Sequence, residues 1–265
     1  MATTDKELEK TTPAGALARP SFIEDSTDGT EGIEREDIKL PRLAIAQGLS
    51  PQMIPGEPAH IPGLVLFDFF NDLTGEKYRS LVPGVKPLQF VVGRRDVKFI
   101  EFDPNDRKVP IDLEVPRHDA RTKWGKDENG KGTPPRATKF VEFVVLLIHD
   151  DGRVPEPVVI SIQETNKWNK KAHERLSGFI KMGQPPSPIY AKIYSATPST
   201  GRNDKGTFGV FQMDQVGFIQ DETLYKVAKK FHGDIKEKKI DLNRESDPDS
   251  FDPEELERTG GAGGM

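Results

Sequence analysis

The side chains of this sequence that could do chemistry are mainly cations and aromatic rings, and the chemistry they suit is contact with a polyanion. The segment Arg117 to Lys139 carries seven Lys or Arg residues against three acidic ones, and it contains the run Lys123-Trp124-Gly125-Lys126. Because lysine attracts phosphate and an exposed indole stacks on a base, the residues Arg121, Lys123, Trp124 and Lys126 are candidate nucleic-acid contacts. The alternative is that Trp124 folds back as a lid over the end of the core.

A second basic feature lies on a predicted helix from Thr165 to Met182. Its apolar positions recur every three to four residues from Trp168 to Phe179, so that face belongs to the core. Four cations line the outside at helical spacing: Lys167, Lys170, Lys171 and Arg175. Solvated lysines are ordinary on a helix, but this stripe shares one basic body with the segment above, and we therefore include it among the candidate contacts.

A predicted strand from Ile189 to Ser195 supplies the third feature. Its aliphatic residues alternate with Tyr190, Lys192 and Tyr194, which therefore share the opposite face. Two rings beside a lysine suit single-strand binding, because the rings stack on bases while the cation meets phosphate. The alternative is that the preceding helix covers this face and that both tyrosines are packed.

The other elements are mostly strands joined by turn sequences. Four hairpins are predicted: Leu64–Phe70 with Tyr78–Val82, Pro87–Val92 with Asp96–Phe102, Lys139–His149 with Pro157–Ile162, and Pro188–Ser195 with Gly206–Ile219. Arg94 and Arg95 stand in the turn of the second hairpin and are further candidate contacts. A second helix begins at Asp221 and ends at Gly233. The predicted fold class is β-rich α+β: an OB-like β-barrel or a curved antiparallel sheet with two packed helices.

Charge divides the chain into three parts. Residues 1–38 hold 4 Lys/Arg and 10 Asp/Glu, and residues 241–265 hold 2 and 8, so each end carries a net charge of -6. The middle, 39–240, keeps 32 Lys/Arg and 25 Asp/Glu, a net charge of +7. We expect disordered acidic tails around an OB-like nucleic-acid-binding core. The tails compete with a polyanion for the core, recruit a partner, or only confer solubility.

Catalytic patterns are missing from the sequence. It has no cysteine, and its five histidines lie far apart without metal-ligand spacing. Glu142, Asp150 and Glu164 could join a nuclease carboxylate cluster, although acidic residues are so common that chance explains their placement better. We expect no enzymatic activity, no cofactor and no metal. The lack of cysteine, of a signal sequence and of a long apolar stretch leads us to expect a cytoplasmic protein.

Three stretches carry a resemblance to a known family. They are Leu40-Pro-Arg-Leu43 leading into Gln47-Gly-Leu-Ser-Pro51, then Asn71-Asp-Leu-Thr-Gly-Glu76, then Lys205-Gly-Thr-Phe-Gly-Val-Phe211. With them, roughly residues 40–232 resemble phage-type single-stranded DNA-binding proteins, which have an embellished OB-fold and an acidic C-terminal tail. The resemblance implies a role in phage DNA replication or recombination in the host cytoplasm. It also makes the acidic tail a candidate contact for replication proteins.

Two other functions stay open at this point. The first is a phage structural or assembly protein that uses the same β-rich body to bind proteins. The second is a metal-dependent nuclease built on the carboxylates named above. Binding of single-stranded against double-stranded oligonucleotides separates the DNA-binding hypothesis from the assembly hypothesis, and metal-dependent cleavage identifies a nuclease.

Overall fold

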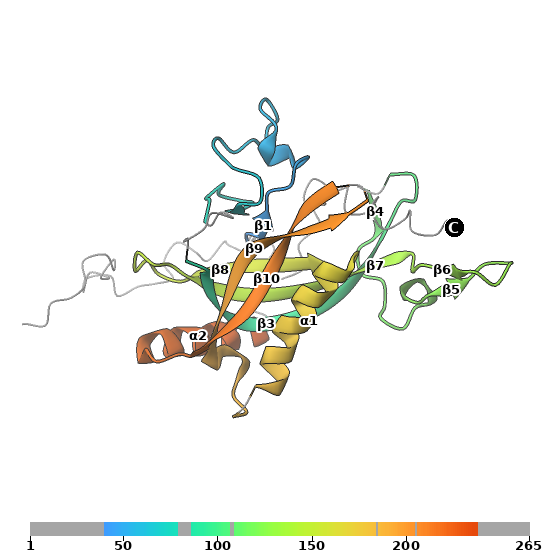
Figure 1. The fold of residues 1–265 in the computed structure, drawn as a ribbon. Helices are drawn as coiled ribbons and strands as arrows, with labels where there is room; N and C mark the ends of the chain where they lie inside the picture. The colour runs from blue at the N-terminus through green and yellow to red at the C-terminus, as the bar shows by residue number, and fades with distance from the viewer. Residues whose placement is uncertain (1–39, 79–85, 107–108, 184, 205, 238–265) are drawn as a thin grey trace, which may run out of the picture.

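A curved antiparallel sheet forms the centre of the protein in this computed structural model (Figure 1). The structure describes residues 40–78, 86–106, 109–183, 185–204 and 206–237. The tails predicted at 1–38 and 241–265 lie outside the described residues. The sheet has six strands in the order β10-β9-β3-β7-β8, with β4 beside the far end of β3. Their bounds are β3 Leu88–Phe102, β4 Pro110–Asp112, β7 Ala137–Ile148, β8 Glu156–Gln163, β9 Lys192–Asn203 and β10 Gly206–Phe218.

The predicted fold class is confirmed as a curved antiparallel sheet, and within the described residues the sheet does not close into a barrel. Other elements bridge its two edges instead. The helix α1 (Lys167–Met182) contacts both β8 and β10, and so does the short strand β1 (Leu43–Ile45). β1 itself pairs with β2 (Phe69–Asn71) in a separate two-stranded sheet. Short 3-10 turns complete the list: η2 Pro51–Met53, η3 Ala120–Thr122 and η4 Ile189–Ala191.

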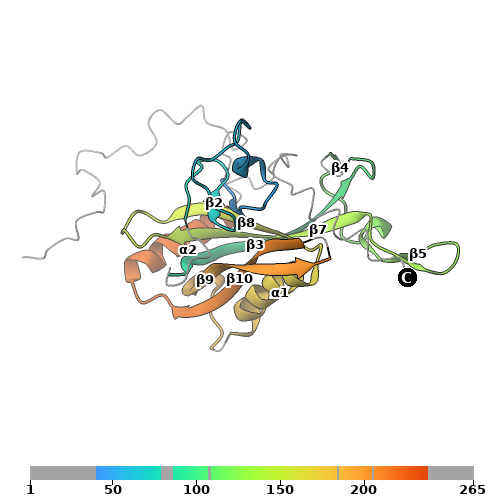
Figure 2. The same ribbon diagram turned by 45° about the horizontal axis from the view of Figure 1, so that its top comes forward.

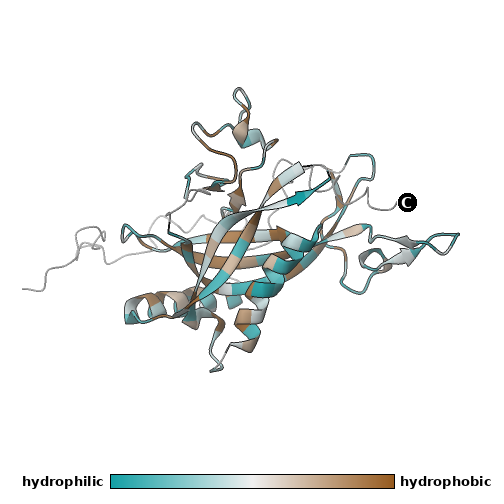
Figure 3. Ribbon diagram, viewed as in Figure 1, coloured by the Kyte–Doolittle hydropathy of each residue, from teal (hydrophilic) through white to brown (hydrophobic). Residues whose placement is uncertain are grey.

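The two helices cover opposite faces of the sheet. α1 buries Ala172 and Leu176 in a core that includes Phe90 of β3. α2 (Glu222–Lys236) buries Phe231 in a second core that includes Val91 of the same strand. Neighbouring residues of a strand point to opposite sides, so the two helices lie on opposite faces. The central strand β7, covered on both faces, is accordingly hydrophobic along most of its length, as the brown colour in Figure 3 shows.

Each helix begins where a polar side chain caps it. Asn166 accepts hydrogen bonds from the backbone N–H groups of Trp168 and Asn169 at the start of α1. Asp221 does the same for Thr223 and Leu224 at the start of α2. Such caps satisfy backbone donors that the first helical turn leaves open. The two helices predicted from apolar spacing are therefore confirmed, with starts within two residues of the expected ones.

The second predicted hairpin is wrong. Residues Leu88 to Phe102 form one continuous strand, and the pairing of β3 with β7 shifts register between Val92 and Arg94. Gly93 is therefore a β-bulge rather than a turn, because apolar residues on both sides of it pair with the same neighbour. A Cβ on Gly93 would lie 2.7 Å from the Phe231 ring, so glycine lets α2 approach β3 closely.

The other hairpins agree with the structure to different degrees. β7 and β8 form the predicted pair. β9 and β10 also pair, but residues 196–203, expected in a loop, belong to β9. In the first hairpin only β2 is a strand. Residues 64–68 are irregular, Lys77 forms an isolated antiparallel bridge with Phe70, and most of the expected partner strand lies outside the described residues.

Two of the stretches behind the family resemblance meet in space. The side-chain amide of Gln47 donates to Gly209 O at 3.1 Å and accepts from Gly209 N at 2.8 Å. A Cβ on Gly209 would lie 2.5 Å from Ile45, so the close approach needs glycine. In the remaining stretch, Asn71 to Glu76, the Asn71 side chain donates to Glu156 of β8 at 2.7 Å and its Oδ1 accepts from Leu73 N. These motifs therefore fasten residues 40–78 to the sheet.

Candidate nucleic-acid interface

An arm leaves the sheet between β4 and β7 and carries the hairpin of β5 (Gly125–Lys126) and β6 (Gly132–Thr133), as Figure 2 shows. Trp124 stands directly before β5 and is 72% exposed. Lys123 and Lys126 are exposed on either side of it. The alternative that Trp124 folds back as a lid is therefore wrong, because the ring lies in solvent on a basic hairpin.

Arg121 anchors this arm to the sheet. Its guanidinium donates to Glu101 at 2.7 Å, to Asp112 at 2.9 Å and to Asp119 at 2.9 Å. The hydrogen bonds from Arg121 lower the pKa of Asp119 to about 2. Because three carboxylates already occupy the guanidinium, we leave Arg121 out of the proposed DNA surface and assign it the positioning of the arm.

The basic side chains predicted on the outside of α1 are in solvent. Lys167, Lys170, Lys171 and Arg175 are all exposed. Two of the four have acidic partners: Lys170 lies 4.0 Å from Glu174, and Arg175 forms an ion pair with Asp214 of β10. Exposed pairs of this kind are weak, so both cations remain exchangeable toward phosphate.

The predicted Tyr-Lys-Tyr face is wrong. β9 begins only at Lys192, since residues 189–191 form η4, and Lys192 and Tyr194 are each 1% exposed. Tyr194 lies in the main core with its ring 6.0 Å from that of Phe90, and burial raises its pKa to about 12. The packed alternative holds, because both faces of β9 are covered here.

Tyr190 has a different place from the other two residues. It is half-buried in η4, and its ring centroid lies 5.7 Å from that of Tyr225 and 5.1 Å from that of His232 on α2. Sequence reasoning did not single out the exposed lysines of the same helix: Lys226, Lys229, Lys230 and Lys236. Lys229 and Lys230 follow Lys226 by three and four residues, and this spacing, which drew attention to α1, could have found them.

Arg94 and Arg95 follow the Gly93 bulge and point to opposite sides of β3. Arg94 pairs with Asp96 at 2.7 Å. Arg95 donates to Ser177 of α1 at 2.9 Å. Both side chains keep part of their surface in solvent. The prediction placed both arginines at the tip of a turn. In the structure they lie within the central strand β3.

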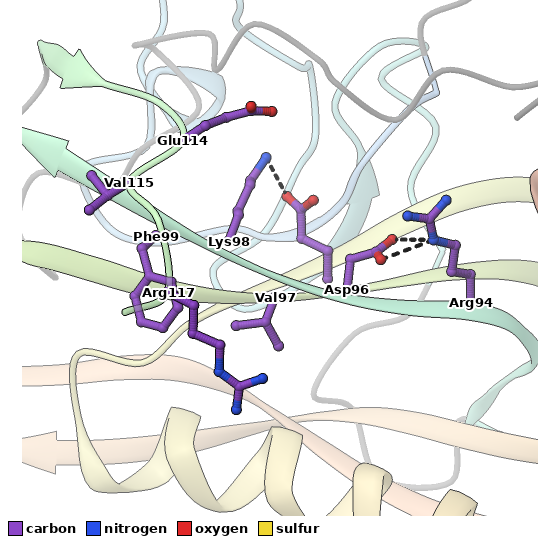
Figure 4. Close-up of a pocket in the computed structure, with 9 residues that line it drawn as sticks. Arg94, Asp96, Val97, Lys98, Phe99, Glu114, Val115 and Arg117 are labelled. Carbon is purple, nitrogen blue, oxygen red and sulfur yellow. Dashed lines mark hydrogen bonds and ion pairs between the residues drawn. The ribbon is translucent and has the colours of Figure 1, made fainter. Parts of the chain in front are cut away.

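A cavity of about 270 Å³ lies beside the Arg94–Phe99 stretch of β3 (Figure 4). Its polar lining consists of three cations and three carboxylates: Arg94, Lys98, Arg117, Asp96, Glu114 and Glu142. Lys98 pairs with Glu142 at 2.9 Å. The cavity is therefore close to neutral, unlike the arm and the outside of α1.

The carboxylates considered for a nuclease are not brought together. Glu142 pairs with Lys98, whereas Glu164 pairs with Lys139 at 2.5 Å and with His173 at 2.8 Å. Burial lowers the pKa of His173, while Glu164 opposes that shift. Within the described ranges, no three His, Asp or Glu side chains are grouped to hold a metal ion. Nor does any helix there have the length and apolarity to cross a membrane.

Residues 10–241 match a family described as Pam3 phage gp34-like protein. The match spans most of the chain and includes every described residue. The chain belongs to the Pam3 phage gp34-like family. It is thus a bacteriophage-type protein, as the resemblance implied, while its finer function is a separate question. No curated protein and no solved structure matches this Pam3 phage gp34-like chain.

Proposed function

We propose that this protein is a non-enzymatic single-stranded DNA-binding protein that acts in phage DNA replication or recombination in the host cytoplasm. The observation that carries the proposal is Trp124, a large apolar ring held 72% exposed between two exposed lysines. Tryptophan usually buries most of its surface in a monomeric protein. A base stacked on the indole would bury it in the complex.

Charge supports the same surface. The body from 39 to 240 carries a net charge of +7, and exposed cations lie on the arm, on α1 and on α2. Each neutralised phosphate releases counterions, so binding through this surface should weaken as salt rises. Stacking does not depend on base identity, and the proposed binding is accordingly sequence-tolerant. Replication proteins are the proposed partners of the acidic C-terminal segment.

The test uses the two tryptophans of the chain, Trp124 and Trp168. Titration of oligothymidylate into the protein should quench the fluorescence of Trp124. The same quench should be seen in the Trp168→Phe variant, in which Trp124 is the remaining tryptophan. The Trp124→Phe variant should lose most of the quench while keeping an aromatic ring, and Trp124→Ala should cost about 1–3 kcal/mol of binding.

Trp168 is the matched control because its ring packs edge-on against Phe208 at 5.6 Å and cannot stack on a base without leaving that contact. With four to six phosphates neutralised, log K should fall against log salt with a slope of roughly -3 to -4. Equal affinity for duplex DNA, or a quench that comes from Trp168, would contradict the proposal.

A further inference from the structure

β3 has an open edge in the middle of the sheet. β9 pairs with β3 only from Leu88 to Val91, and β4 pairs with β3 only at Glu101 and Phe102. Between these points, no strand of the described chain pairs with this edge. An edge of unpaired backbone groups is a template for another strand.

Two hydrogen bonds show which backbone groups face the open edge. Gly93 O lies 2.7 Å from His232 Nδ1, and Phe99 O accepts from Val115 N at 2.9 Å. Both carbonyls point away from β7, and backbone direction repeats every second residue. The N–H and C=O groups of Arg95 and Val97 therefore point to the same open edge, where an added strand can pair with them.

The side chains at this edge separate into a charged side and a side on which Val97 and Phe99 lie with Arg95. Val97 and Phe99 line the cavity from one side of β3, and Arg117 lies on that side as well (Figure 4). In Figure 4, Arg94, Asp96 and Lys98 project from the other side of β3. Along that side the charges alternate in sign. This arrangement suits a strand with apolar residues on one face and alternating charges on the other.

The mixed charge decides between a peptide and DNA. Arg94 and Lys98 form ion pairs with Asp96 and Glu142, at 2.7 and 2.9 Å, so cations and carboxylates lie side by side at this edge. A polyanion placed here would meet Asp96 and the exposed Glu114. Pairing of this edge with the same edge of a second copy is disfavoured, because in each copy the open stretch is short and is flanked by β9 and β4.

We propose that this edge of β3 binds an extended segment of a partner protein by strand addition. The segment places acidic residues opposite Arg94 and Lys98 and a basic residue opposite Asp96. Its apolar residues lie on the side of β3 that holds Val97 and Phe99. This site is separate from the proposed DNA surface, and it gives the assembly hypothesis a specific structural basis.

Amide hydrogen exchange on the full-length protein tests the site directly. The probe is the synthetic peptide Thr-Glu-Val-Lys-Val-Glu-Thr. When it is bound, the amides of Arg95 and Val97 should exchange at least about tenfold more slowly. The amides of Asp96 and Lys98, which face β7, should not change. Unchanged exchange at Arg95 and Val97 overturns the proposal.

A variant and a control peptide sharpen the test. Val97→Pro removes an N–H that faces the open edge and leaves the pairing with β7 intact, so peptide binding should weaken at least about tenfold. The peptide Thr-Lys-Val-Glu-Val-Lys-Thr, with inverted charges, should bind more weakly to the wild type. If Val97→Pro does not fold, the exchange experiment on the wild type still decides. Equal binding of both peptides, or protection of Arg95 and Val97 by oligothymidylate, contradicts a peptide site.

Discussion

Two aromatic residues that the sequence marks as equal candidates have opposite environments in the structure. Trp124 is 72% exposed and Tyr194 is 1% exposed. The sequence shows the alternation around Tyr194, but not that the strand starts at Lys192 or that both of its faces are covered. The sequence leaves Trp124 open between a base contact and a lid over the core, and its exposure in the structure decides against the lid.

Stability measurements should separate these two residues. Tyr194→Ala removes a buried ring and should lower the free energy of unfolding by about 3–5 kcal/mol, the range for large-to-alanine changes in a core. Trp124→Ala should change it by less than about 0.5 kcal/mol, since exposed sites contribute little. Chemical denaturation of both variants makes the comparison. A Tyr194→Ala variant as stable as the wild type would contradict the burial of Tyr194 and make this residue a candidate DNA contact again.

At the scale of elements, apolar spacing predicts both helices, and apolar runs on either side of turn residues predict the β7–β8 pair and part of the β9–β10 pair. This reasoning fails at β3. Gly93-Arg94-Arg95 has the composition of a turn, and only tertiary pairing shows that β7 runs along both sides of the glycine. Tertiary contacts also determine the two proposed sites. The ion pairs of Arg121 and the open edge of β3 both depend on contacts between segments that are distant in the sequence.

The bulge of β3 gives the element-scale prediction. Gly93→Ala would place a methyl group 2.7 Å from the Phe231 ring, which must shift together with the start of the bulge. We expect a loss of about 1–3 kcal/mol in the free energy of unfolding, as for other overpacked sites. Gly48→Ala is the matched control, because a Cβ there has no neighbour within 4 Å. Thermal unfolding of both variants is the measurement, and equal melting temperatures would contradict a close α2–β3 contact.

At the scale of the whole molecule, the sequence alone predicts the division of charge. Two ends of -6 flank a body of +7, and the structure adds where the exposed cations of that body lie, on the arm, α1 and α2. The acidic ends are connected to the basic body by the chain itself. Their local concentration beside it is therefore set by the chain itself, independent of the protein concentration.

Deletion of residues 241–265 tests whether the C-terminal segment competes with DNA. The deletion removes 2 Lys/Arg and 8 Asp/Glu, so the net charge of the chain changes from -5 to +1. Affinity for oligothymidylate at low salt should rise a few-fold, and the difference should shrink as salt shortens the Debye length from about 10 Å at 0.1 M to about 3 Å at 1 M. Replacing the eight acidic residues of this segment by their amides should reproduce the deletion, because the effect depends on charge. Fluorescence anisotropy across a salt series measures both variants, and an unchanged low-salt affinity would show that the segment does not reach the DNA surface.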